Sequence, residues 1–331
     1  MMIFSSGLYV HKNMKSKILN YLKEKNDFVS GQDISRDLQV SRTAVWKYVK
    51  QLQAIGYDIE AVSRKGYRLI AQPDKLFPDL IQDRLGTKVF GKKIIYLEST
   101  NSTMNDATRL AIEGACEGTI VCAETQTDGR GRRGRNWVST KGQGIYFSIV
   151  LRPHIPLSQA AALTLVFAVA LSKAIRVTTG LEAVIKWPND ILISKKKVAG
   201  ILMELSAETD HIHYIVVGIG LNVEGKAFFG LPQATSLEQQ LGQGISRVQV
   251  FQEILRQAEE HYALFQKKGF APIARIWREY SATLHQQVKI TEARSTTEGI
   301  AIDIDDQGAL LIQERSGRVV RKITGDVIHL R

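Results

Sequence analysis

The sequence predicts a multidomain α+β protein: an N-terminal winged helix-turn-helix, a central mixed α/β domain and a C-terminal small SH3-like β-barrel. Three observations support this fold class. Helical spacing and then a basic hairpin come first, strands mixed with helices fill the middle, and short strands separated by turn signals end the chain. We predict a disordered extension over residues 1–13 and domains over 14–72, 73–282 and 283–331.

Composition limits the class of protein. The chain has 331 residues, 44% of them hydrophobic, and a formal net charge of +11. This length allows more than one core, and the charge favours an anionic partner, with a solvated basic surface as the alternative. Cys116 and Cys122 are too few for a disulfide scaffold and fit a reducing cytoplasm. We find no signal peptide, and the apolar run 160–171 is too short to span a bilayer. We therefore expect a cytoplasmic protein without a membrane partner.

The first domain combines three helices with a hairpin. Ser41 is a good N-cap for the third helix. Apolar residues at i, i+3, i+4 and i+7 from Val45 form one buried face of that helix. Met14 is a possible true start, because a helical pattern begins there. The predicted elements are helices over 14–25, 31–40 and 41–56 and two strands within 59–70 around a Lys65-Gly66 turn.

This order of elements suits DNA binding. A helix N-terminus can enter the major groove, and a basic hairpin can reach phosphates. Residues 1–75 contain 13 Lys and Arg against seven Asp and Glu. A small helical domain with an ordinary charged surface is the alternative. The residues that we expect to bind DNA are Ser41, Arg42, Thr43, Lys47, Arg64 and Lys65.

The central domain mixes strands and helices from about residue 88 to 280. Its strands cluster in hairpins, so we expect a mixed, mainly antiparallel sheet. From about residue 283 short strands alternate with turns, which indicates a small barrel that serves as a structural cap or docking module. In the central domain we predict strands over 92–98, 119–125 and 144–151, further strands within 181–223, and helices over 101–114, 158–176 and 248–269.

The stretch GRGRRGRNW (129–137) matches the letters of the G-x-G-x-x-G dinucleotide pattern but not its context. A strand rather than a helix follows it, and no acidic residue occurs between Arg135 and Glu182. Its three glycines permit close backbone approach, and its four arginines are donors for phosphate or carboxylate. We expect a segment that is mobile when empty and that orders around a ligand. An exposed basic loop that touches DNA is the alternative.

Three central motifs point to a family. TQTDGRGRRGRNW (125–137), with KWPNDILI (186–193) and KKVAGILMEL (196–205), resembles the biotin–protein ligases, also called biotin–[acetyl-CoA-carboxylase] ligases. The winged helix makes the chain similar to the bifunctional form, which also represses biotin-synthesis genes. The resemblance covers about residues 14–331.

The resemblance implies an ATP-dependent enzyme with ATP and Mg²⁺ as cofactors. Such an enzyme activates biotin as biotinoyl-AMP and transfers it to a lysine of a biotin carboxyl carrier protein. It also implies a biotin-responsive repressor that binds operator DNA, for which we hypothesise a homodimer when the adenylate is bound. A lipoate-type ligase and a non-catalytic biotin-sensing repressor remain open as alternatives, and so does a ligase that no longer binds DNA.

The resemblance also implies roles for single residues. The implied catalytic residues, which would neutralise developing negative charge, are Arg132, Lys186 and Lys197. The implied biotin-binding residues are Ser99, Thr100, Asn101, Gln126, Arg130, Gly131, Arg132 and Lys197. The implied ATP-binding residues are Arg132, Arg135, Lys186, Asn189, Asp190 and Asn222. We expect no metal site built from protein ligands alone.

Two of these segments also have a purely structural interpretation. Ser99 or Thr100 would serve as a helix cap, and Asn189-Asp190 would form a capped turn. Gly200 is expected to let its strand approach the ligand closely, and Gly218 and Gly220 match a family segment that lies near the nucleotide. The family often carries an aromatic residue after Asn222 that covers the adenine. Here Phe228 and Phe229 are the candidates, and either would equally suit the core.

Overall fold

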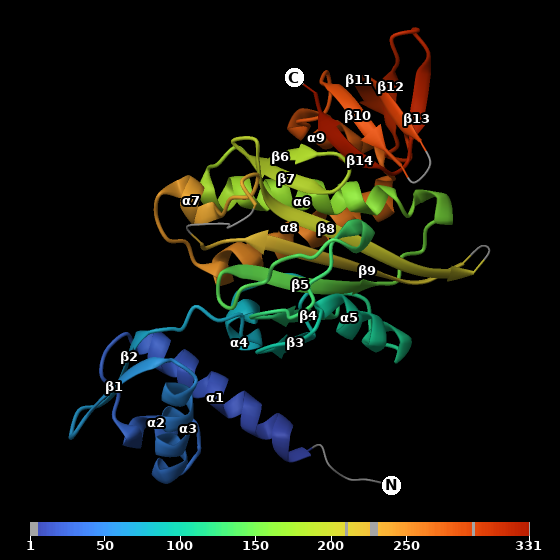
Figure 1. Cartoon of the computed structure of the whole chain (residues 1–331). Helices are drawn as coiled ribbons and strands as arrows, with labels where there is room; N and C mark the ends of the chain where they lie inside the picture. The colour runs from blue at the N-terminus through green and yellow to red at the C-terminus, as the bar shows by residue number, and fades with distance from the viewer. Residues whose placement is uncertain (1–5, 209–210, 226–230, 293–294, 331) are drawn as a thin grey trace. The chain divides into compact units, whose positions relative to one another are not determined.

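The computed structural model describes residues 6–208, 211–225, 231–292 and 295–330. It divides into two units, Met1–Asp74 and Lys75–Arg331 (Figure 1). The proline-containing stretch 71–79 contains the boundary. Each unit has its own core and is described separately.

The first unit is a helix-turn-helix followed by a two-stranded antiparallel hairpin. As predicted, Ser41 caps the third helix, and its Oγ accepts the Ala44 N–H at 3.1 Å. Gly66 opens the second strand with φ +108°, and a Cβ there would lie 2.0 Å from the Val29 carbonyl oxygen, so this position requires glycine. The elements are α1 (Ser6–Lys25), α2 (Gly31–Asp37), α3 (Arg42–Ala54), β1 (Asp58–Val62) and β2 (Gly66–Ala71).

The first unit departs from the predicted pattern in two places. Helix α1 begins at Ser6 rather than near Met14. The predicted disordered extension therefore differs from the structure over residues 6–13, and residues 1–5 lie outside the described part. Val45 and Val49 are buried as predicted, whereas Tyr48 of the same face is only half-buried.

A seven-stranded sheet forms the centre of the second unit, in the order β3-β4-β5-β9-β8-β7-β6. Within the described strands only β3 and β4 pair in parallel, so the prediction of a mixed, mainly antiparallel sheet is confirmed. The strands are β3 (Ile94–Leu97), β4 (Ile120–Ala123), β5 (Gly144–Leu151), β6 (Val184–Lys186), β7 (Asp190–Ile193), β8 (Lys196–Glu208) and β9 (His211–Asn222).

Helices cover both faces of this sheet (Figure 1). Alternate residues of one strand therefore enter different cores: Val150 packs with Met104 of α5, whereas Ile149 packs with the α6 and α8 side chains. Three of the helices, α4, α7 and α9, were not predicted. The helices are α4 (Pro78–Gln82), α5 (Thr103–Ile112), α6 (Ala162–Thr179), α7 (Leu237–Leu241), α8 (Arg247–Lys268), α9 (Ala271–Tyr280) and the 3₁₀ turns η1 (Arg132–Gly134) and η2 (Leu157–Gln159).

Helix α6 is apolar all round. The segment Leu157–Thr179 is long and apolar enough to cross a membrane by length and composition, but 72% of its apolar window is buried inside the protein. It ends at Gly180, which has φ 71°. It is therefore a core helix.

The C-terminal strands form a five-stranded antiparallel sheet in the order β13-β12-β11-β10-β14. The described pairing confirms an antiparallel C-terminal sheet with β13 and β14 at its edges, and closure of this sheet into the predicted SH3-like barrel stays a prediction. Its inner side chains join the main core, and the Trp187 indole N–H donates to the Gly308 carbonyl at 3.1 Å. The strands are β10 (Gln287–Thr291), β11 (Thr296–Ile304), β12 (Leu310–Gln313), β13 (Val319–Lys322) and β14 (Asp326–His329).

Candidate functional site

A cavity of about 340 Å³ lies on the face of the central sheet that also carries α5. The arginine loop, the turn before β7 and the ends of β8 and β9 form its wall. These segments are far apart in the sequence and include all three motifs singled out above. The predicted site residues that line the cavity are Gln126, Arg130, Gly131, Arg132, Arg135, Asn189, Asp190, Lys197 and Asn222.

Some predicted residues do not line this cavity. Ser99, Thr100 and Asn101 lie before α5, where the Thr100 hydroxyl donates to Asp106 and the Asn101 side-chain oxygen accepts from Thr127. The next two residues, Ser102 and Thr103, reach the cavity instead. The N-cap of α5 is Ser102, so neither Ser99 nor Thr100 is the helix cap.

A small polar cluster stands at one side of the cavity. The Gln126 Oε1 accepts from the Thr103 N–H at 2.9 Å and from its hydroxyl at 3.1 Å, and the Gln126 Nε2 donates to Ser139 Oγ at 2.8 Å. Ser148 lies 2.9 Å from the Thr103 hydroxyl. The buried Ser102 hydroxyl has no hydrogen-bond partner among the residues that the structure describes. A polar group of a bound ligand would satisfy this hydroxyl.

Trp137 supplies a broad apolar wall. A Cβ on Gly220 would lie 2.4 Å from the Trp137 Cε2, and one on Gly200 would lie 3.1 Å from its Cζ3. A Cβ on Gly218 would lie 2.5 Å from the Met104 sulfur. Gly200 was expected to let its strand approach the ligand closely, and Gly218 and Gly220 were expected to lie near the nucleotide. In the structure they make room for the protein's own side chains, which in turn border the cavity.

The arginine loop is held down by side chains from two other segments. Arg132 donates to Asn189 Oδ1 at 2.8 Å and to Thr324 Oγ1 at 2.9 Å. Arg133 and Arg135 both pair with Asp326, at the start of β14. The loop therefore borders the cavity while it contacts the C-terminal segment, and it turns at Arg133, which has φ 55°. Asp326 of that segment also lines the cavity.

The cavity gathers more positive than negative charge. Lys197 Nζ lies 2.6 Å from Asp190 Oδ1 and 5.4 Å from the Trp137 ring centroid. Lys186 is not among the lining residues, but its pKa is lowered by burial. Asp190 partly opposes this shift, and the charge of Lys197 adds to it. An anion would relieve this repulsion, so the site suits a polyanionic ligand.

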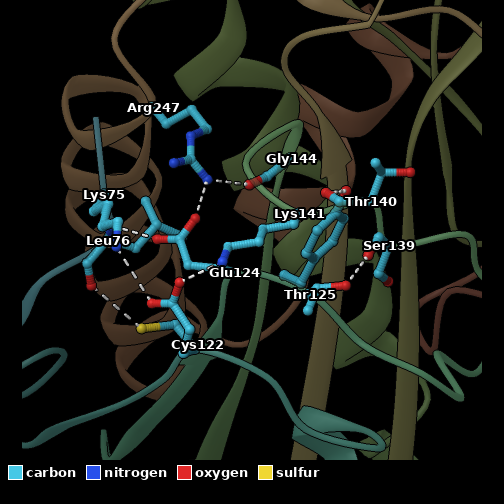
Figure 2. Close-up of polar contacts among 12 residues, drawn as sticks. Lys75, Leu76, Cys122, Glu124, Thr125, Ser139, Thr140, Lys141, Gly144 and Arg247 are labelled. Atoms are coloured by element: carbon cyan, nitrogen blue, oxygen red, sulfur yellow. Dashed lines mark hydrogen bonds and ion pairs between the residues drawn. The ribbon is translucent and has the colours of Figure 1, made fainter. Parts of the chain in front are cut away.

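A buried ion pair anchors the segment that leads into the cavity (Figure 2). Glu124 and Arg247 meet at 2.8 Å with side chains that are each 2% exposed. The other carboxylate oxygen of Glu124 accepts the Leu76 N–H at 2.9 Å, and Arg247 donates to the Gly144 carbonyl at 3.1 Å. Glu124 precedes Gln126 by two residues, so this pair fixes the start of the cavity wall relative to β5 and α8.

The predicted DNA-binding residues lie together in the first unit. Arg42, Thr43 and Lys47 are exposed on α3, after the cap Ser41. Arg64 and Lys65 are exposed at the turn between β1 and β2. The surface is therefore available to an anionic partner.

Several residues at the cavity were missed by the sequence analysis: Ser102, Thr103, Trp137 and Asp326. Trp137 is the last residue of the stretch GRGRRGRNW (129–137), and its place in that motif could have identified it as a site residue. Asp326 lies in a different domain and gave no local signal. Phe228 and Phe229, the candidates for covering the adenine, lie outside the described residues.

A helix-turn-helix and a basic, loop-covered cavity on a mixed sheet define a DNA-binding protein that also holds a small anionic ligand. Three family descriptions match the chain: HTH domain over 15–68, Biotin/lipoate A/B protein ligase family over 96–222 and Biotin protein ligase C terminal domain over 283–330. The chain belongs to the biotin protein ligase family.

Similar proteins support this assignment over nearly the whole chain. The bifunctional ligase/repressor BirA of Bacillus subtilis is 43% identical over 310 residues, which cover 92% of this chain and 94% of that protein. The Escherichia coli protein of the same name is 29% identical and covers 94% of this chain and 95% of its own. The structure of biotin protein ligase from Aquifex aeolicus in complex with biotin and ATP superposes with a TM-score of 0.64 at 30% identity, covering 72% of this chain and 99% of that one.

Proposed function

We propose that the cavity activates biotin with ATP and passes it to a lysine of an acceptor protein, while the first unit binds operator DNA. Bifunctional ligase and repressor activity is the function of this family branch. One observation carries the site assignment: the arginine loop lies over the cavity and joins Arg132 to Asn189 of the second motif.

The first step joins the biotin carboxylate to the α-phosphate of ATP. A carboxylate oxygen attacks the α-phosphorus, the bond to the bridging oxygen of the β-phosphate breaks, and pyrophosphate leaves. Negative charge develops on the phosphate oxygens, and we propose that Arg132, Lys186 and Lys197 neutralise it. Fixing the two reactants side by side supplies the rest of the rate enhancement.

The second step transfers the biotinoyl group. The neutral amine of the acceptor lysine attacks the carbonyl carbon of the mixed anhydride, and AMP leaves. Water would destroy the same anhydride, so the intermediate must be shielded. We propose that the arginine loop, which contacts Asp326 and Thr324, is that shield.

We assign the biotin and nucleotide ends from the chemistry of the wall. Gln126, Ser102 and Thr103 suit the ureido ring, and Trp137 suits the apolar chain. Arg130, Gly131 and Lys197 then lie toward the carboxylate, with Ser99, Thr100 and Asn101 as outer biotin contacts. The nucleotide contacts that we propose are Arg132, Arg135, Lys186, Asn189, Asp190 and Asn222.

Magnesium is part of this proposal. The described residues contain no cluster of three or more acidic, histidine or cysteine side chains that would hold a metal by themselves. Mg²⁺ in nucleotide sites is commonly held by one or two carboxylates together with the substrate phosphates. Asp190 at the cavity fits this role. The ion would neutralise phosphate charge when it is bound with ATP.

The partners follow from the two activities. We propose a biotin carboxyl carrier protein as acceptor and a homodimer that binds a two-fold operator once the adenylate is in place. We also propose a cytoplasmic location, a closed SH3-like barrel, and domain boundaries near residues 14–72, 73–282 and 283–331.

The test is to mix the protein with biotin and MgATP, without acceptor, and to detect biotinoyl-AMP by mass spectrometry. The adenylate should form and should be lost in Arg132→Ala and Lys197→Ala. Lys195→Ala is the matched control, since Lys195 is an exposed lysine in the hairpin between β7 and β8. Biotin binding without adenylate would favour the non-catalytic repressor. Adenylation of lipoate but not of biotin would favour the lipoate-type ligase.

A further inference from the structure

Trp46 is an unusual residue on helix α3. Its side chain is 54% exposed, whereas Trp187 and Trp277 are 2% and 0% exposed. The helix already has a complete apolar face, formed by Val45, Val49 and Leu52. The indole is therefore not one of the side chains that form the core of the first unit. A large exposed aromatic side chain of this kind commonly marks a binding surface.

The neighbours of Trp46 are polar or positively charged. Arg42 and Lys50 are four residues before and after it, so both lie on the same side of the helix. Thr43, three residues before it, and Lys47, next to it, are also exposed. Helix α3 contains no acidic residue. A partner of this surface must be a polyanion that also offers an apolar group to the indole.

Duplex DNA meets both requirements in its major groove. Phosphates line the groove edges and attract Arg and Lys, but they offer no apolar surface. On the groove floor the thymine 5-methyl group is the apolar group that proteins read. A helix of this width enters the groove with its exposed face toward the base edges. Trp46 lies in the middle of the exposed face, between the cations.

We propose that Trp46 is a specificity-determining residue of operator binding, and that its indole contacts a thymine 5-methyl group in the major groove. The proposal rests on the DNA-binding function proposed above. It predicts that two residues of α3 make different contributions to DNA binding. Lys47 contributes phosphate affinity that does not depend on sequence, and Trp46 contributes preference for particular thymines.

The experiment uses the full chain with biotin and MgATP. A duplex is first selected from a randomised pool by the wild-type protein. Dissociation constants are then measured for this duplex and for a scrambled duplex at several salt concentrations. The variants are Trp46→Ala, Trp46→Phe and, as the phosphate-contact control, Lys47→Ala. Each thymine of the selected duplex is also replaced in turn by deoxyuridine, which lacks only the methyl group.

Trp46→Ala should weaken binding to the selected duplex by roughly fivefold or more and leave binding to the scrambled duplex and the salt dependence unchanged. Trp46→Phe should keep part of the preference. One deoxyuridine replacement should weaken binding of the selected duplex by the wild-type protein, and the same replacement should not weaken its binding by Trp46→Ala any further. Lys47→Ala should weaken binding to both duplexes. It should also reduce the slope of log affinity against log salt concentration by about one. Unchanged binding of the scrambled duplex also shows that the first unit of each Trp46 variant is folded.

Three results would overturn the proposal. Equal weakening of both duplexes by Trp46→Ala would make Trp46 a backbone contact, and no weakening would place it outside the interface. A deoxyuridine effect that is the same in the wild-type protein and in Trp46→Ala would assign the methyl group to another residue. If the wild-type protein selects no duplex at all, the repressor function itself fails, which is distinguishable from these results.

Discussion

Replacing Glu124 with alanine should strongly destabilise the second unit. The carboxylate pairs with Arg247 at 2.8 Å, and both side chains are 2% exposed (Figure 2). Its second oxygen accepts the Leu76 N–H at 2.9 Å. The substitution would take the Glu124 carboxylate away from the buried Arg247 guanidinium and would leave a buried backbone donor without its acceptor. Neither group has access to water that would replace the lost partner.

The size of the effect follows from these two losses. Breaking a buried ion pair by removing one partner costs about 3–5 kcal/mol. Leaving a buried N–H unpaired costs about 1–3 kcal/mol. The two costs are not additive, because both come from the loss of the same Glu124 carboxylate. Arg247 also keeps its hydrogen bond to the Gly144 carbonyl. We therefore expect the free energy of unfolding of the second unit to fall by about 3–5 kcal/mol.

Urea unfolding of the full chain measures this fall. The chain has two units and is not expected to unfold in one step, so the signal must report on the second unit alone. Trp187 and Trp277 are buried there, and their fluorescence reports its unfolding once Trp46 is replaced by phenylalanine. Glu113→Ala is the matched control. Glu113 pairs with Arg109 at 3.1 Å, but the two side chains are 55% and 60% exposed.

The control should lower the stability by less than about 0.5 kcal/mol, because exposed helical ion pairs contribute little. A double variant, Glu124→Ala with Arg247→Met, should recover part of the loss, since it removes the uncompensated charge. If Glu124→Ala costs no more than Glu113→Ala, the buried pair does not stabilise the fold, and the reasoning is refuted.

Three further predictions concern the cavity. Gly220→Ala should displace the Trp137 indole. Biotin binding, measured by calorimetry, should weaken about tenfold, as expected for a clash worth about 1–3 kcal/mol. The control Gly244→Ala should bind biotin normally, because a Cβ there meets nothing within 4 Å. Asp326→Asn should release two loop arginines and speed the loss of preformed biotinoyl-AMP in a chase experiment; an unchanged rate would show that this contact does not hold the loop. Because burial lowers the pKa of Lys186 from its ordinary 10.5, its charge is lost as pH rises, and kcat for adenylation should fall at a pH below 10.5. Lys186→Arg should move this alkaline limb upward, and a limb that stays in place would rule out Lys186 as its source.

Features that depend on neighbours in the sequence were predictable from the sequence alone. The Ser41 cap and the buried spacing of α3 depend on residues within two turns of one another. The alternation of strands and turns likewise predicted the mixed sheet. The arginine loop was separated from a dinucleotide-binding turn by its local context, because a strand rather than a helix follows it. The motifs carried the family resemblance for the same reason, since each is a continuous stretch.

The tertiary structure decided which distant side chains meet. Asp326 reaches the arginine loop only because the C-terminal sheet packs beside the cavity, and Arg247 reaches Glu124 only because α8 packs against β5. The choice of Ser102 over Ser99 at the cavity depends on where α5 begins. No periodicity or spacing encodes these contacts, because they depend on how whole elements pack in three dimensions. The sequence by itself therefore determined the class of protein and singled out the arginine loop, and only the packing of distant elements determined which side chains hold that loop in place beside the cavity.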